Sequence, residues 1–532
     1  MKNFKRAISL IIVFSLLFSL TGCFDTSEMF AKHSKGKAAE NKNYTPVEDI
    51  NINIPYISND SLNPYAAKSE TNHKLATLIY DSLYTVGNDF QPIPLIAHSY
   101  KTEGNSLVVT IKSGLTFSDG SPLTVSDVVY SFDKAKNCDA YSDDLSNLDR
   151  ADATNTNDVT FTFRTFEVDL VNLLTFPIIK GQGSEDDLGY YYNSNDSESV
   201  FKIPAGSGRY FLTKDKHNSY YLCCNTQRLG GYFPKHRNIG LVGTAEEDKI
   251  DPMYSLGRIN FISETYEDGQ YRQIIGKAVR YSLPNFVYLV CNVTDPILNN
   301  AEIKKAISYA IDRKELSDFC FIGNALPTEL PFHPDYYKTK KITNEDKTYV
   351  DAIKQLESIG YTQVNSVYNF RYNPENPSAV LEFSLAVCSD NEFKLIAAEK
   401  IKEQLGKANI RVNIFEYSEE DFFKVLSSNA YDMYIGECKL KNNLNLTRFF
   451  TVGSTLSYGI NSYSDSAVAY LSYQNGNTDI GLFVNTFRDD LPFIPLLYRT
   501  GNIFSNQAIK TADEAIVTDF YYNADKWTNV ND

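Results

Sequence analysis

Residues 380–435 carry the pattern that most restricts the fold of this chain. Three short runs of apolar or alternating residues are typical of strands and lie at 380–387, 410–414 and 431–435. Between them stand two stretches of helical periodicity. The first is closed by Gly406, and the second is opened by Ser418 with Asp421 as a capping pair. This β-α-β-α-β order predicts parallel strands joined by right-handed crossovers.

The segment after the third of these strands is where pattern alone predicts a binding site. Ligands of parallel α/β sheets bind beyond the carboxyl ends of the strands. In this chain that position is GECKLKNN, residues 436–443, which offers a carboxylate, lysines and amides.

Other elements are predicted in patches along the chain. Residues 158–164 alternate apolar and polar side chains and predict a strand. Thr124 and Asp127 form a capping box that opens a helix, and Asp312 with Glu315 forms a second one. One buried helical face is predicted from the spacing of Ile303, Ala306, Ile307, Ala310 and Ile311.

Length and charge limit the class of protein. At 532 residues with 43% hydrophobic content, the chain is too long for a single core, and two or three domains are expected. The formal net charge of −15 disfavours nucleic acid or any other strongly anionic surface as a partner.

The N-terminal residues predict export and a lipid anchor. Basic residues precede an apolar run that ends in Leu-Thr-Gly-Cys at Cys23, which resembles a bacterial lipoprotein signal. Residues 1–22 are therefore expected to be a signal peptide, and residues 23–44 a polar tether that begins at the acylated Cys23. The apolar run is short for a membrane span, and the alternative is an ordinary signal peptide with a chance cysteine. The rest of the chain is expected outside the cytoplasm.

Known catalytic, cofactor and metal motifs are missing from the sequence. There is no Walker loop, no Gly-x-Ser-x-Gly elbow and no His-Glu-x-x-His, and the six histidines show no metal-ligand spacing. Seven cysteines besides Cys23 are an odd and scattered set, which predicts buried thiols and not a disulfide framework. We expect a binding protein with no enzymatic activity, no cofactor and no metal.

Four blocks of sequence resemble one known family. The stretch from Leu75 to Phe132, which includes "GLTFSDGSPLTVSDVVYSF", is similar to the family 5 extracellular solute-binding proteins, the oligopeptide- and dipeptide-binding proteins of ABC importers. The segments "GSGRYFL", "LVCNVTDPILNNAEIKKAISYAIDRKEL" and "AAEKIKEQLGKANIRVNIFEY" resemble later motifs of the same family in order. The likeness covers roughly residues 60–505.

The resemblance implies an α/β fold of the two-lobed, type II periplasmic-binding-protein kind, with mixed sheets flanked by helices and an extra subdomain. Lobe one would take residues 45–285 plus 490–532, with the subdomain inserted at about 79–204. Lobe two would take residues 286–489. A monomer of this fold would close on a peptide by hinge motion and deliver it to a membrane permease.

The segment expected to bind the ligand departs from the family. Peptide-binding members have a Trp and an Asp-rich stretch after the last strand, and one Asp pairs with the peptide amine; this chain has "GECKLKNNLNLTRFF". Glu437 could supply the carboxylate, with Lys439 and Asn443 as donors. The alternative for Glu437 is a surface or lobe-bridging role, because a buried charge needs a partner.

Two further pairs of residues are expected at the cleft. Tyr458 and Asn461 lie in a stretch that resembles the family's cleft-facing segment, and Glu70 and Asn72 would rim the cleft from the facing lobe. The leading hypothesis for function is an importer's peptide receptor. The alternative is a cell-surface receptor, signalling or adhesion lipoprotein that uses the same fold to bind a non-peptide solute.

Overall fold

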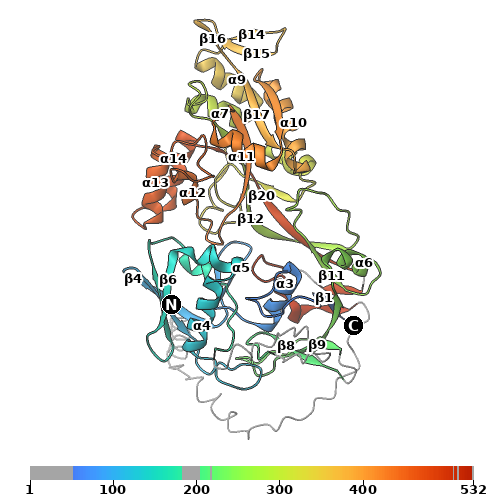
Figure 1. Ribbon diagram of the computed structural model, residues 1–532. Coiled ribbons are helices and arrows are strands. Elements are labelled where there is room, and N and C mark those ends of the chain that lie inside the picture. The colour runs from blue at the N-terminus through green and yellow to red at the C-terminus, as the bar shows by residue number, and fades with distance from the viewer. Residues whose placement is uncertain (1–51, 182–203, 216–218, 507, 512–513, 530–532) are drawn as a thin grey trace, which may run out of the picture. The chain divides into compact units, whose positions relative to one another are not determined.

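The computed structural model describes residues 52–181, 204–215, 219–506, 508–511 and 514–529 (Figure 1). The predicted signal peptide, Cys23 and the tether lie outside the described residues, as does part of the predicted subdomain. No helix in the described part of the chain has the length and apolarity needed to cross a membrane.

One four-stranded sheet lies near the N-terminal helix of the described chain. Its strands run in the order β1 (Asn53–Ile57), β10 (Asn238–Thr244), β9 (Tyr220–Cys224) and β8 (Tyr210–Lys214). β1 pairs with β10 in parallel, and the other neighbours are antiparallel. Helix α3 (Glu70–Ile79) contacts β1 and β8 and buries Leu75, Ala76 and Leu78.

A second four-stranded sheet is antiparallel and covered by a helix. Its order is β4 (Ala97–Glu103), β5 (Ser106–Ile111), β7 (Asp158–Phe163) and β6 (Leu148–Ala153), and helix α4 (Val125–Lys136) packs on it. The predicted strand at 158–164 is confirmed, because Val159, Phe161 and Phe163 are buried while their neighbours are not. The predicted capping box of Thr124 and Asp127 is also confirmed.

The largest sheet is mixed and contains the predicted β-α-β-α-β unit. Its order is β11 (Phe261–Glu264), β20 (Ile494–Ser505), β12 (Lys277–Cys291), β19 (Met433–Lys439), β17 (Glu382–Cys388) and β18 (Arg411–Tyr417), with β13 (Ala325–Pro327) paired to β20. β17 is parallel to both β18 and β19, as predicted, and α10 (Glu392–Lys407) and α11 (Glu419–Ser427) are the connecting helices.

The predicted end of α10 at Gly406 is wrong. Gly406 lies inside the helix, which continues to Lys407, and the left-handed residue that follows is Asn409, with φ of 57°. Asparagine adopts the left-handed region more readily than most residues, so it takes the position that the sequence pattern assigned to glycine.

Two long strands link different parts of the fold. The first half of β12 pairs with the last residues of β20, whereas its second half lies between β19 and the first residues of β20 and pairs with both. The pairing of β12 with β20 shifts register between Ser282 and Phe286, around Pro284, which has no N–H to donate to the ladder. In Figure 1 these strands run between the group of helices and strands around β17 and the group around β1.

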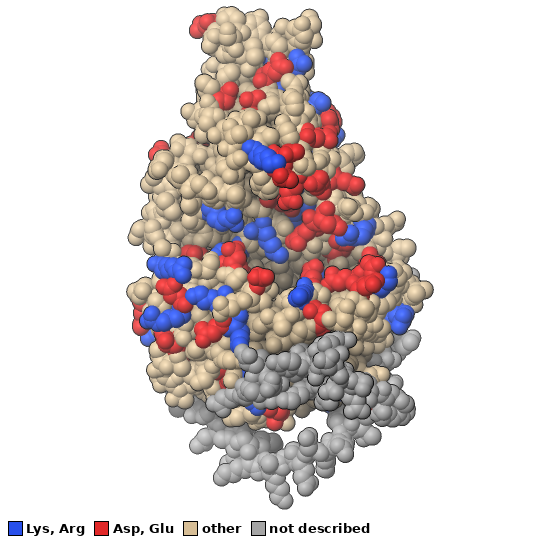
Figure 2. Space-filling view, in the orientation of Figure 1, with Lys and Arg blue, Asp and Glu red and all other residues tan. Residues whose placement is uncertain are grey.

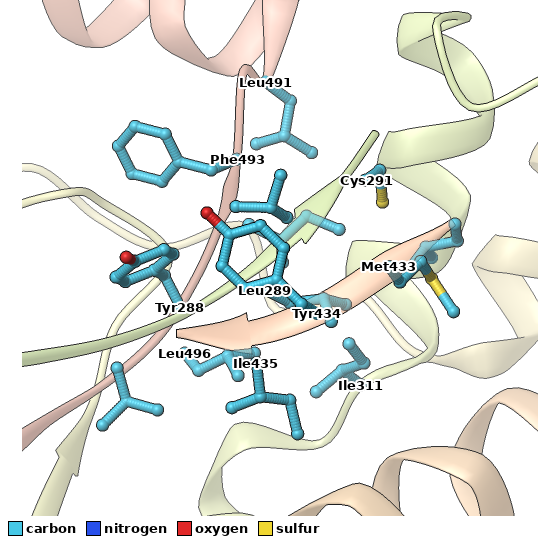
Figure 3. Close-up of a cluster of buried hydrophobic side chains, with 14 of the residues drawn as sticks. Tyr288, Leu289, Cys291, Ile311, Met433, Tyr434, Ile435, Leu491, Phe493 and Leu496 are labelled. Atoms are coloured by element: carbon cyan, nitrogen blue, oxygen red, sulfur yellow. The ribbon is translucent and has the colours of Figure 1, made fainter. Parts of the chain in front are cut away.

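The main hydrophobic core lies around the second half of β12 (Figure 3). Tyr288, Tyr434 and Phe493 are buried there, and the rings of Phe449 and Phe493 stack with centroids 4.6 Å apart. Helix α7 (Ala301–Ala310) presents the predicted apolar face, and the side chain of Asp312 caps the short helix α8 (Arg313–Glu315). All seven cysteines of the described residues are free thiols.

The remaining elements complete the connections. They are β2 (Tyr84–Val86), β3 (Pro92–Pro94), α5 (Asp139–Ser142), η1 (Asp144–Asn147), η2 (Leu170–Leu173), η4 (Glu247–Lys249), α6 (Ile250–Ser255), η5 (Leu316–Cys320), α9 (Tyr349–Ser358), β14 (Gln363–Asn365), β15 (Phe370–Asn373), β16 (Asn376–Val380), α12 (Thr447–Phe450), α13 (Asp465–Gln474), α14 (Ile480–Asp490), β21 (Ile509–Thr511), η6 (Ala524–Lys526) and β22 (Thr528–Asn529).

Candidate functional site

A cavity of about 480 Å³ lies where segments distant in sequence converge. Its walls come from α3, from residues 140–144, from the turn at 516–520 and from residues 439–442 at the end of β19, with Tyr281 and Leu283 of β12 also in the lining. Charged side chains of both signs surround a hollow at mid-height of the face shown in Figure 2. The volume is in the range of small-molecule sites.

Helix α3 presents one face to this cavity. Glu70, His73, Lys74 and Thr77 recur at helical spacing and all line it. The start of the helix is fixed by Ser69, whose side chain accepts from the backbone N–H of Asn72 and donates to the carboxylate of Asp60 at 2.6 Å. The capped first turn therefore places the polar face.

The charged groups of α3 neutralise each other. Lys74 Nζ lies 2.7 Å from the Glu70 carboxylate, donates to the Ser263 hydroxyl and stands over the Phe520 ring at 5.4 Å from its centroid. Burial by itself would raise the pKa of Glu70, but the Lys74 ammonium outweighs it, and the pKa is lowered from its ordinary value.

Residues 140–144 form the facing wall, and Lys441 is tied to them. Lys441 Nζ donates to the carbonyl of Asp143 at 2.6 Å and to the hydroxyl of Ser146 at 2.8 Å. Burial raises the pKa of Asp144 to about 6; Lys441 opposes this shift and Asp143 adds to it. The half-buried Asp144 is therefore the strongly perturbed acid of this wall.

The segment 436–443, predicted to follow the strand, is in part strand, because β19 continues to Lys439; its residues 439–442 line the cavity. The N–H of Leu440 donates to the carbonyl of Pro284 at 2.9 Å, which holds residues 439–442 against the irregular part of β12. Lys439 is well exposed, and its ammonium lies 3.9 Å from the Glu267 carboxylate. Residues 439–442, at the carboxyl end of β19, thus form one wall of the cavity.

The family model of bacterial extracellular solute-binding proteins, family 5 (middle region), matches residues 91–440, which is more than half of the chain. The chain belongs to this family. The match includes the β-α-β-α-β unit and ends within the cavity wall at Leu440. This shows the family that the sequence motifs resembled.

Relatives and solved structures agree with this assignment. The glutathione-binding protein GsiB of Pectobacterium atrosepticum is 24% identical over 290 residues, 52% of this chain and 55% of that protein. The chain thus spans about half the length of the curated relatives it matches. An ABC transporter substrate-binding protein from Sinorhizobium meliloti has a TM-score of 0.67 at 16% identity, over 90% of this chain and 99% of that one.

A nickel ABC transporter structure from Bacillus halodurans also has a TM-score of 0.67, at 15% identity, covering 86% of this chain and 96% of that one. At such identities the likeness shows the fold. The expected fold class is confirmed: this solute-binding chain has the mixed α/β fold of type II periplasmic binding proteins.

Of the family 5 site residues predicted from sequence, Glu70 and Lys439 line the cavity. Asn72, two residues after Glu70 on α3, does not line the cavity. Its buried side chain accepts from the N–H of Ile57 at 2.9 Å and donates to the carbonyls of Ile57 and Ser61, both at 3.0 Å. Asn72 therefore ties α3 to the end of β1.

Glu437 lies outside the cavity lining, in an ion network of the large sheet. Its carboxylate is 3.3 Å from the guanidinium of Arg499 on β20 and 3.6 Å from Lys394 Nζ on α10. Since side chains alternate along a strand, Lys439 shares the face of Glu437, but it lies one pleat further on, at the strand end where the cavity opens.

The other three predicted residues are also absent from the lining. Asn443 is buried and donates to the Glu167 carboxylate at 2.9 Å. Tyr458 is half-buried against the main core, and its carbonyl accepts from the Tyr434 hydroxyl at 3.2 Å. Asn461 is exposed, and its side chain accepts from the N–H of Tyr463 at 3.0 Å.

Sequence reasoning missed several lining residues of the cavity. Helical spacing from Glu70 could have found His73 and Lys74, because positions i+3 and i+4 share a face. No such spacing identifies Asp144 or Thr518, because both are far in sequence from α3 and reach the cavity only in the folded chain.

A second cavity of about 530 Å³ adjoins the first and shares Glu70, Lys74, Thr265, Glu267 and Phe520 with it. Its remaining charged lining is mostly acidic: Glu247, Asp248, Asp251, Glu264, Asp268 and one base, Arg272. Arg272 pairs with Glu264 at 2.7 Å and with Asp268 at 2.6 Å.

Proposed function

We propose that this chain is the substrate-binding component of an ABC importer and encloses a peptide in the 480 Å³ cavity. The observation that carries the proposal is the composition of the cavity wall. Ammonium and carboxylate groups line one cavity from α3, from 140–144 and from 439–442. A zwitterionic ligand offers both charges, and it would meet partners on more than one wall.

The two lobes of the proposal are residues 45–285 with 490–532 and residues 286–489, with an inserted subdomain at about 79–204. The strand pairing supports this division, because β12 pairs with β20 along both of its halves, whereas β11 joins β20 only beside the first half of β12 and β19 joins only the second half. The register shift at Ser282–Phe286 is a natural place for bending, since the ladder is interrupted there.

Binding then proceeds by population shift and not by bond chemistry. Open and closed arrangements exchange by hinge bending at β12 and β20, and a ligand that touches both walls binds the closed form better. Shifting such an equilibrium from 1:99 to 99:1 requires roughly 10⁴-fold tighter binding to the closed form. Contacts from both Lys74 on α3 and Lys439 at the end of β19, which belong to different proposed lobes, would supply part of that difference.

Delivery to a permease and anchoring at Cys23 complete the proposed role. The Leu-Thr-Gly-Cys sequence at Cys23 supports acylation, and two acyl chains give stable membrane attachment. The receptor would then act outside the cytoplasm as a monomer held near its transporter. Replacing Cys23 by Ser should move the protein from the membrane fraction to the soluble one, and unchanged fractionation would remove the anchor from the proposal.

The test of ligand binding uses thermal unfolding of the purified chain with glutathione and a panel of tripeptides. A relative is named a glutathione-binding protein and a structural neighbour a nickel transporter, so Ni²⁺ with histidine serves as a non-peptide arm. Tm should rise with peptides, and the radius of gyration from X-ray scattering should fall. Lys74→Ala should weaken binding at least 10-fold, while the exposed, distant Lys101→Ala should not.

A Tm that rises only with the metal arm would replace peptide by another solute. A panel without effect on either Tm or scattering would favour the alternative of a surface receptor that retains the fold.

A further inference from the structure

Most acidic groups of the first cavity already have a cation. Among the described lining residues, Glu70 pairs with Lys74 at 2.7 Å, Glu267 lies 3.9 Å from Lys439, and Asp519 pairs with the buried Arg209 at 2.7 Å. Asp143 is exposed to solvent, where a carboxylate needs no protein partner. Asp144 differs from all of these.

Asp144 is a half-buried carboxylate in the cavity wall that lacks a protein partner. It is the first residue of η1, and no hydrogen bond or ion pair from the described residues reaches its side chain. Lys441, the cation with the largest effect on Asp144, already donates to the Asp143 carbonyl and the Ser146 hydroxyl. The ammonium of Lys439 lies 3.9 Å from the Glu267 carboxylate.

Removing a carboxylate from water without a partner is unfavourable, and the protonation of Asp144 reflects this. Burial raises its pKa to about 6, and the charges of Asp143 and Glu167 act in the same direction. Lys441 and Lys439 act against them without cancelling the effect. A cation that entered the cavity would offset this desolvation penalty. An ammonium group should therefore bind more favourably beside Asp144 than beside a fully solvated carboxylate.

We propose that Asp144 receives the ammonium group of the ligand and restricts the cavity to solutes that carry a free amine. The inference rests on the proposed function and adds the chemical class of the ligand. It moves the amine-binding role from β19, where Glu437 is already engaged by Arg499, to the wall formed by residues 140–144. The exposed Lys439 would then be left for the anionic end of the same ligand.

The test compares a panel of tripeptides with free amino termini, glutathione among them, with the same peptides N-acetylated. Thermal shift and titration calorimetry of the whole chain give the affinities. Free-amine peptides should bind at least 10-fold more tightly than their acetylated forms. Asp144→Asn should reduce that preference to less than 2-fold. Asp139→Asn, the same change at an exposed position of α5 outside the lining, should leave it intact.

The pH dependence supplies a second readout. Affinity of the wild-type chain for free-amine peptides should fall as pH drops through about 6, because protonation removes the negative charge of Asp144. Affinity of Asp144→Asn should be flat over that range. Equal binding of free and acetylated peptides, or an unchanged preference in Asp144→Asn, would overturn the assignment while leaving peptide capture intact. A panel in which nothing binds would overturn both.

Discussion

The carboxylate of Glu437 on β19 lies 3.3 Å from the guanidinium of Arg499 on β20, across the intervening strand β12. Arg499 is only 1% exposed. Its guanidinium lies 5.2 Å and 5.1 Å from the ring centroids of Phe321 and Phe393, and it donates to the carbonyl of Tyr266 at 2.7 Å. This pair therefore joins the sheet to the segment that leads from β11 into both cavities.

Glu437→Gln should destabilise the fold and leave ligand affinity nearly unchanged. The substitution keeps the shape of the side chain but leaves Arg499 as a buried cation with one fewer anion, which costs about 3 kcal/mol in comparable buried pairs. Urea unfolding measures the loss, and calorimetry with the tripeptide panel measures the affinity. A loss of binding without loss of stability would instead make Glu437 a ligand contact.

Asp169→Asn should weaken a polar contact between the two proposed lobes. The contact joins Asp169 to residues 336–338, away from the proposed hinge strands β12 and β20. Asp169 accepts from the hydroxyls of Tyr336 and Tyr337 at 2.7 Å and 2.8 Å and from Lys338 Nζ at 2.8 Å. Because the amide has no charge, these three bonds weaken, and the free energy of unfolding should fall by about 1–3 kcal/mol. X-ray scattering of the ligand-free chain should show a larger radius of gyration. Asp152 is an exposed carboxylate on β6 whose only ion pair among the described residues is with Arg150, and Asp152→Asn should change neither quantity.

Local patterns predicted much of the fold because they report local forces. The alternation of Val159, Phe161 and Phe163 and the capping box at Thr124 depend on neighbours a few residues away, and both were correct. The β-α-β-α-β order even placed one cavity wall, at residues 439–442. The error at Gly406 arose because glycine is not the only residue that adopts the left-handed conformation after a helix, and Asn409 does so here.

The walls formed by residues 140–144 and 516–520 could not be predicted in this way. Asp144 and Thr518 line the same cavity as residues 439–442 only because of tertiary folding, and no spacing in the sequence links 144 with 441 or 518. Family resemblance pointed to Glu437 by position, but the buried Arg499 that engages it comes from a strand about 60 residues later. Partners at such separation decide whether a carboxylate faces a ligand or a salt bridge.

Gly501→Ala should disturb the cavity by displacing Tyr281, which lines it. A methyl group at Gly501 would lie 2.2 Å from the ring of Tyr281, its cross-strand partner on β12 and a cavity-lining residue. The ring must shift, so stability should fall by about 1–3 kcal/mol and peptide affinity should change. Gly406→Ala is the matched control, because its methyl group meets nothing closer than 3.8 Å. In a helix it should stabilise the chain by up to about 1 kcal/mol.

Asp144→Asn should stabilise the ligand-free chain at neutral pH and not at low pH. The pKa of Asp144 is about 6 in the folded state, above its ordinary value, so the folded chain binds more protons than the unfolded chain between about pH 4 and 6. Stability contributed by this group is therefore present below about pH 4 and is lost as pH rises through 6. The amide removes that loss.

Thermal unfolding at pH 4 and pH 8 measures the effect. Relative to wild type, Asp144→Asn should raise Tm by roughly 1–3 °C at pH 8 and leave it unchanged at pH 4. Asp139→Asn, exposed in the same segment, should show no such pH-dependent difference. A lower Tm for Asp144→Asn at pH 8 would mean that the carboxylate stabilises the empty protein, and the unpaired state on which the amine site rests would be wrong. A gain in stability together with a loss of free-amine binding is the combination expected of a group kept for its ligand.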